Sequence, residues 1–177
     1  MTLGDRIVIM KDGFIQQVGT PQQVFDEPHN LFVAGFIGSP QMNFMDAKLL
    51  KDGDKYTVEV LGHKVVIDGE KGEMLKNNNA PAGDIVLGVR PEHMSVKFEK
   101  DADAIEGTIV VNEMMGSELH LHVNVGLSKN VILRIPTIDL TPAQRAALEG
   151  GNKLYFSFAS KVVQIFDPKS EKSLLFA

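Results

Sequence analysis

The feature that most constrains the fold is a series of short apolar segments running from about residue 47 to residue 166. Residues 56–60 and 119–125 alternate apolar with polar side chains, which is typical of half-buried β-strands. Residues 85–89 are almost entirely apolar, which indicates a strand buried on both faces. Glycine-containing turns separate these segments. The pattern predicts a mainly β fold, an open or closed β-barrel or a sandwich.

The opening of the chain follows another pattern. Residues 6–10 and 14–18 predict a β-hairpin, because the intervening Asp12-Gly13 supplies the positive φ of a tight turn. Thr20 and Pro21 then predict a helix start, with threonine as the N-cap and proline in the first turn. A hairpin alone is only marginally stable in water. Residues 1–37 are therefore expected to be the end of a larger domain.

Residues 31–44 join these two patterns. Leu31, Phe32, Phe36 and Ile37 have the spacing of one helical face, and the Gly-Ser-Pro sequence at 38–40 ends that helix. The strand pattern is expected from residue 46 onward. We therefore predict two parts, residues 1–37 and residues 38–177. A second capped helix is expected near residues 141–148, closed by the glycines that follow it.

Composition excludes several classes of function. The chain of 177 residues has a net charge of −5 and no basic block, which disfavours nucleic-acid binding. It contains no cysteine, so neither a disulfide framework nor a thiolate metal site can form. No apolar run approaches the roughly 20 residues of a membrane-spanning helix. Residues 1–6 lack the cationic and apolar regions of a secretory signal.

Motifs for nucleotide chemistry are also missing from the sequence. A P-loop requires Gly-Lys-Ser/Thr, and none of the glycines is followed by lysine. The glycine pair at 150–151 follows a predicted helix, so it fits a C-terminal cap better than a phosphate site. Asp167 ends an apolar segment but precedes proline, which favours an ordinary turn over a magnesium ligand. We therefore predict no catalytic residue and no cofactor-binding or metal-binding residue.

The hairpin around residue 116 carries the most polar group of side chains. Glu118, His120 and His122 alternate on one strand and so share one face. They could hold a metal if another ligand joined them, but a half-exposed strand face is the favoured interpretation. Glu113 and Glu118 flank the Met-Met-Gly-Ser sequence at 114–117. They could act as an acid–base pair, although a solvated turn is favoured.

Arg90 and Glu92 flank Pro91 between two predicted strands. They could present a recognition patch, or they could hold the kink at the proline by charge and hydrogen bonds, and the second interpretation is favoured. As candidates for a partner or regulatory surface we name Arg90, Glu92, Glu113 and Glu118.

Four segments together resemble the ATP-binding subunits of carbohydrate importers in the ABC superfamily, above all those of maltose and multiple-sugar uptake. These segments are residues 1–13 (MTLGDRIVIMKDG), 17–21 (QVGTP), 32–44 (FVAGFIGSPQMNF) and 88–93 (GVRPEH). In that family the P-loop, signature and switch sequences lie upstream of the segment that matches residue 1. The resemblance therefore implies the last part of a nucleotide-binding domain in residues 1–37, followed by an OB-like, TOBE-type regulatory domain in residues 38–177.

The resemblance implies the remaining properties. The chain alone should not be an enzyme, whereas the complete subunit would use ATP and magnesium. The barrel domain would form a homodimer and receive regulators such as a phosphotransferase-system component or a transcription regulator. The complete subunit would be cytoplasmic and peripheral, held at the inner membrane face by permease subunits.

Two alternatives come from other classes of function. The first is a small-ligand module that binds an oxyanion or a sugar, for which Arg90 and Lys129 are the nearest anion-binding candidates. The second is a metal-dependent enzyme built around His120 and His122.

Overall fold

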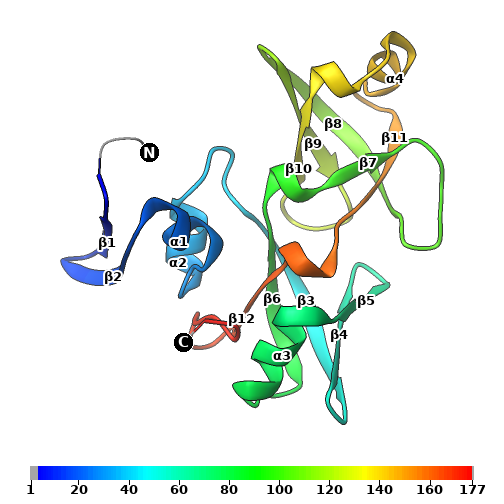
Figure 1. Ribbon diagram of the computed structural model, residues 1–177. Coiled ribbons are helices and arrows are strands. Elements are labelled where there is room, and N and C mark those ends of the chain that lie inside the picture. Colours follow the sequence, from blue (N-terminus) through cyan, green and yellow to red (C-terminus); the bar gives the residue numbers. More distant parts are fainter. Residues whose placement is uncertain (1–3, 177) are drawn as a thin grey trace.

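Two five-stranded antiparallel sheets make up most of the molecule (Figure 1). The computed structural model describes residues 4–176, so the expectations about residues 1–3, and residue 177, lie outside the described part. The first sheet has the order β12-β6-β3-β4-β5 and the second the order β10-β9-β8-β11-β7. The predicted mainly β architecture is confirmed.

The bounds of the strands follow the predicted segments closely. The first sheet contains β3 (Asn43–Asp52), β4 (Lys55–Val60), β5 (His63–Ile67), β6 (Gly83–Val89) and β12 (Gln164–Phe166). The second contains β7 (Ser95–Lys97), β8 (Ile105–Met115), β9 (Glu118–Asn124), β10 (Val131–Pro136) and β11 (Lys153–Ser157).

A single hydrophobic core joins the two sheets. Leu49, Tyr56 and Leu87 from the first sheet pack in the same cluster as Leu121 and Phe156 from the second, and all five side chains are fully buried. Because both sheets contribute their apolar faces to one cluster, they behave as one packing unit. We call residues 43–166 the β region.

The β region also contains short helices. These are α3 (Gly69–Asn77), α4 (Pro142–Ala147) and the 3-10 turns η1 (Pro91–His93), η2 (Thr137–Asp139) and η3 (Ser160–Val162). Helices α3 and α4 lie at opposite ends of this region (Figure 1). The cap of α4 is confirmed, because the Thr141 side chain accepts from the Gln144 N–H. Helix α3 was not expected; it contains two glycines and buries only Leu75, so its sequence carries little helical signal.

The opening residues form a smaller unit, which we call the N-terminal unit (residues 4–37). The hairpin β1 (Ile7–Lys11) and β2 (Phe14–Gly19) turns at Asp12-Gly13 as predicted, with φ of 51° and 85°. Helix α1 (Pro21–Asp26) has the predicted threonine cap. Helix α2 (Leu31–Phe36) completes the unit. In Figure 1 the hairpin lies to one side, away from the two larger sheets.

Two details of the predicted junction are wrong. The buried face of α2 carries Val33 and Ala34, whereas Phe36 is 61% exposed. Val33 packs into the small cluster of the N-terminal unit and Ala34 packs against Phe166 of the β region, so α2 is held from both sides. In addition, β3 begins at Asn43 rather than after residue 46, because the alternation of buried and exposed residues already starts there.

The N-terminal unit is joined to the β region by residues from the far end of the sequence. Asn30 forms a β-bridge with Lys172. The Leu31 N–H donates to the Glu171 carbonyl and the Ser173 N–H donates to the His29 carbonyl, each at 2.9 Å. The C-terminal segment therefore lies beside the start of α2, as its red trace in Figure 1 shows. We call this contact between residues 29–31 and residues 171–173 the joint.

Candidate functional site

The β8–β9 hairpin carries two of the acidic residues singled out in the sequence. Its strands meet in a two-residue turn, Gly116-Ser117, and Met115 lies opposite Glu118 in register. Gly116 has a φ of 67°, a conformation that glycine adopts without strain. The methionines at 114–115 belong to β8, so the predicted four-residue turn is too long by two residues.

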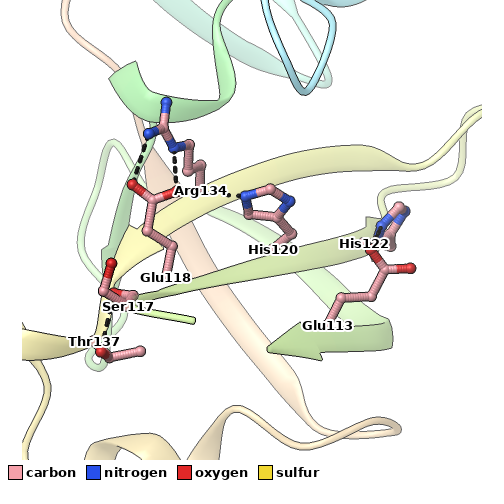
Figure 2. Close-up of polar contacts among 7 residues, drawn as sticks. All are labelled: Glu113, Ser117, Glu118, His120, His122, Arg134 and Thr137. Atoms are coloured by element: carbon pink, nitrogen blue, oxygen red, sulfur yellow. Dashed lines mark hydrogen bonds and ion pairs between the residues drawn. The ribbon is translucent and has the colours of Figure 1, made fainter. Parts of the chain in front are cut away.

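Five polar side chains line the outer face of this hairpin and its neighbour β10. On β9, Glu118, His120 and His122 point outward and alternate with fully buried apolar residues, which confirms their predicted shared face. His120 lies opposite Glu113 of β8 and opposite Arg134 of β10. We call these five residues the polar strip, and Figure 2 shows them across the three strands.

Arg134 and Glu118 form the shortest contact of the strip. The Nε and Nη2 atoms of Arg134 donate to the two carboxylate oxygens of Glu118, each at 2.6 Å. This paired hydrogen bond lowers the pKa of Glu118 and raises the pKa of Arg134. Glu92 on η1, which packs against β10, adds a second negative charge near Arg134 that raises its pKa further. The geometry fixes the orientation of both side chains.

The two histidines face different carboxylates. Nε2 of His120 lies 3.7 Å from a Glu118 oxygen, and Nε2 of His122 lies 3.5 Å from a Glu113 oxygen (Figure 2). Nε2 of His120 is buried and has no hydrogen-bond partner among residues 4–176. Across the same described range, no three histidine or carboxylate side chains gather in a way that could hold a metal ion. The arrangement consists of separate acid–histidine pairs.

Arg90 lies elsewhere, in the interior of the molecule. Its side chain is only 3% exposed, and its guanidinium stacks over the Phe25 ring at 3.6 Å. It donates to the carbonyl of Ile37 at 2.7 Å and to the carbonyl of Phe25 at 2.5 Å. Burial lowers the pKa of this guanidinium. The expectation that Arg90 belongs to a recognition surface is therefore corrected: it connects the β region to the N-terminal unit.

The structure thus brings together three of the four candidate residues. Glu113 and Glu118 lie in the polar strip and Glu92 lies next to it, whereas Arg90 is buried. Sequence reasoning missed Arg134, the fourth residue of β10, because its position opposite His120 follows from the pairing of β9 with β10. Lys129, the other anion candidate, is exposed in the loop before β10.

Comparisons with known proteins agree with this architecture. Residues 38–94 match the MalK OB fold domain, and residues 87–166 match the TOBE domain. Among solved structures, the chain is similar to the cytoplasmic molybdate-binding protein ModG, with a TM-score of 0.55 over 71% of this chain and 96% of that chain. Only 13% of residues are identical in that comparison, so the likeness concerns the fold. The chain is thus a protein with OB and TOBE domains.

Curated relatives extend the comparison beyond these domains. The chain is 45% identical over 126 residues to the uncharacterized ABC transporter ATP-binding protein YcjV of Escherichia coli O157:H7, covering 71% of this chain and 34% of that protein. It is 33% identical to YurJ of Bacillus subtilis, another uncharacterized ABC transporter ATP-binding protein; the match covers 98% of this chain and 46% of that protein. It is 34% identical to the sn-glycerol-3-phosphate import ATP-binding protein UgpC of a Ruegeria species; the match covers 97% of this chain and 43% of that protein.

These matches show MalK-type OB and TOBE domains within residues 38–166, and they show that the chain's homologues are ABC transporter ATP-binding proteins. The chain spans less than half the length of the curated relatives it matches. Within the described residues, no helix has the length and apolar character needed to cross a membrane.

Proposed function

We propose that this chain is the regulatory and dimerisation part of the ATP-binding subunit of a carbohydrate-importing ABC transporter. The matches to MalK-type OB and TOBE domains support this proposal, as does the likeness to a subunit named for sn-glycerol-3-phosphate import. In the complete subunit, ATP and magnesium would bind outside the β region. Membrane permease subunits would hold that subunit at the inner face of the membrane.

We assign residues 1–37 to the end of the nucleotide-binding domain and residues 38–177 to the regulatory domain. The exposed face of the β1–β2 hairpin supports this division. Val8 is 50% exposed, Met10 53% and Ile15 62%, and by register they share one face, which is a large apolar surface for so small a unit. A two-stranded hairpin cannot bury such a face by itself, so the proposed remainder of the nucleotide-binding domain would cover it.

The observation that carries the mechanical part of the proposal is the buried Arg90 bridge. Arg90 belongs to the β region, yet its two hydrogen bonds end on main-chain carbonyls of the N-terminal unit. Gln164 makes a similar contact, because its Nε2 donates to the Asp26 carbonyl at 2.8 Å. A displacement of the β region would therefore be passed to the N-terminal unit, and through it to the ATP-hydrolysing domain.

Two such β regions in a homodimer would keep the ATPase halves near each other, so that their closure becomes effectively intramolecular. A regulatory protein that binds one arrangement better than the other would shift the open–closed equilibrium. The acidic side chains Glu92, Glu113 and Glu118, next to exposed Met115, form a candidate surface for such a partner.

Sedimentation velocity of the purified chain over a wide concentration series tests the dimer. We expect the chain to dimerise at micromolar or higher concentration. If the chain sediments as a monomer at every concentration, the proposed homodimer of β regions is contradicted. Binding of ATP with magnesium by this chain alone would contradict the assignment of nucleotide binding to other parts of the subunit.

A further inference from the structure

An open cavity of about 230 Å³ lies between the N-terminal unit and the first sheet. Phe25 of α1 and Met74 of α3 form apolar wall, and Gln164 of β12 also lines it. One water molecule needs about 10–15 Å³ of cavity volume, so a group of a few heavy atoms fits inside. Drug-sized ligands need roughly 300–1,000 Å³, so the cavity suits a short extension of one of its own side chains better than a separate large ligand.

Charged side chains of both signs line this cavity. They are Lys71, Arg90 and Lys161 on the positive side and Asp26, Glu27 and Glu70 on the negative side, and His93 lines it as well. Arg90 is already committed, because its guanidinium donates to the carbonyls of Phe25 and Ile37. The formal charges balance, so the lining favours neither a free anion nor a free cation. What remains is the nucleophilic chemistry of an amine.

Lys71 holds its amine in an unusual environment for a lysine. Its side chain is half-buried, and its Nζ donates to the main-chain carbonyl of Val163. The lysine ion pairs within residues 4–176 involve Lys76, Lys97 and Lys153 instead. A neutral carbonyl stabilises a partly buried ammonium group less than a carboxylate does, so this environment favours the neutral amine.

The protonation of Lys71 agrees with this environment. Burial lowers the pKa of Lys71 to about 8, although Glu70 and Asp26 act in the opposite direction. By contrast, the hydrogen bond to Glu106 raises the pKa of Lys153 above the usual lysine value of 10.5. At about pH 7.5, about a quarter of an amine with a pKa of 8 is neutral, against about one part in a thousand at the usual 10.5. Only the neutral amine has the lone pair that attacks an electrophile.

We infer that Lys71 is a site of covalent acylation, at which the amine takes a short acyl group from an activated acyl donor and holds it in the cavity. An acyl phosphate or a small thioester is such a donor. The site goes beyond the proposed transport role and does not depend on it. Because Lys71 belongs to α3 and Asp26 to α1, acylation removes a charge attraction between the β region and the N-terminal unit.

The reaction needs only the amine and the donor. The Lys71 nitrogen attacks the acyl carbon, a C–N bond forms, and the C–O bond of the acyl phosphate or the C–S bond of the thioester breaks. Phosphate or thiolate leaves with the electron pair, and the surplus proton of the amine passes to water. The amide product keeps one N–H for the Val163 carbonyl. It carries no charge, so the cost of burying the ammonium group disappears.

The test is residue-resolved mass spectrometry of the whole chain after brief treatment near neutral pH, with acetyl phosphate in one arm and S-acetyl-N-acetylcysteamine in the other. We expect Lys71 to be acetylated about tenfold faster than Lys153 in at least one arm, and the faster arm identifies the donor class. The gain in neutral amine is larger, but a lower pKa also weakens the nucleophile, with a Brønsted slope of about 0.4–0.5 for thiols. Lys153 is a demanding reference, because its side chain is 68% exposed and accessibility alone would make it the faster one.

Two controls connect the rate to the fold and to the residue. In concentrated urea the preference for Lys71 should vanish, because the burial that lowers its pKa is lost. Lys71→Arg keeps a positive donor and should remove most of the singly acetylated product. Lys153→Arg is the matched variant and should leave that product unchanged, because Lys153 pairs with Glu106 away from the cavity.

Two outcomes would overturn the inference. The first is acetylation of Lys71 no faster than that of Lys153 with both donors in the folded chain, which would mean that burial protects the amine instead of activating it. The second is the same preference for Lys71 in the folded and the urea-unfolded chain, which would assign the reactivity to the local sequence and not to the cavity. Neither result alters the sedimentation test of the dimer.

Discussion

The N-terminal unit and the β region differ in how they bury apolar residues. The β region draws on two sheets for one core, in which residues such as Leu87 and Leu121 are completely enclosed. The N-terminal unit has only a small cluster around Val24 and Val33, and it leaves side chains such as Phe14 exposed. The comparison teaches that the β region can maintain its own fold, whereas the N-terminal unit depends on what it contacts.

Core truncation should give the largest effect and separate the two regions. We expect Leu87→Ala to destabilise the whole β region by about 2–5 kcal/mol, because it opens a cavity in the shared core. Val24→Ala removes fewer atoms from a small cluster, so it should cost about 1–2 kcal/mol and act mainly on residues 7–36. Denaturant unfolding combined with hydrogen exchange measures both effects. Equal loss of protection in both regions after Val24→Ala would contradict the comparison.

Removal of the Arg90 bridge should be next in size. Arg90→Met leaves the carbonyls of Phe25 and Ile37 without their charged donor, which should loosen the N-terminal unit by about 2–3 kcal/mol. Hydrogen exchange should rise in residues 7–36 and stay low in the β region. Arg134→Met is the matched control, because that arginine is partly exposed and should matter little for stability. If both variants behaved alike, the bridge would have no special role.

The pH dependence of stability should report on Lys71. Burial lowers its pKa in the folded chain to about 8, below the usual lysine value of 10.5. Below pH 8 the amine is protonated in both the folded and the unfolded chain. The cost of burying its charge then lowers the free energy of unfolding in full. As pH rises from 8 to 10.5 the folded state loses the proton first, so unfolding becomes costlier by about 2–3 kcal/mol. Urea unfolding across this range should show the rise in the wild type and lose most of it in Lys71→Met.

The two threonine caps give the smallest effects and a direct contrast. Thr20 in the N-terminal unit and Thr141 in the β region begin helices with the same capping box. Replacement of either by alanine should cost about 1 kcal/mol. We expect Thr20→Ala to raise exchange across the N-terminal unit, because α1 forms part of its small cluster, while Thr141→Ala frays only α4. A global effect from Thr141→Ala, measured by exchange, would weaken the distinction.

Features with a local chemical cause could be predicted from the sequence. The Asp12-Gly13 turn needs only the positive φ of its two residues, and the helix start at Thr20 needs only a cap and a proline. Most strands of the β region could be predicted from the alternation of apolar and polar residues. The start of β3 and helix α3 were missed, because Asn43 is a weak strand former and the α3 sequence has two glycines and one buried residue.

The candidate site could be predicted only in part. The shared face of Glu118 and His120 follows from strand alternation alone. The contact with Arg134 depends on pairing between β9 and β10, and the position of Arg90 depends on carbonyls more than fifty residues away in sequence. No local pattern encodes such distances. The cavity beside Gln164 is likewise a product of packing between distant segments.

The pairing of residues 29–31 with residues 171–173 has a consequence for biosynthesis. Ribosomes add about 5–20 residues per second, so the first helices leave the exit tunnel many seconds before their partner segment exists. During that interval α2 lacks the segment around Lys172 that bridges to Asn30, and the apolar side of the hairpin is open to other molecules. Docking of residues 29–31 must therefore wait until residues 171–173 have been synthesised.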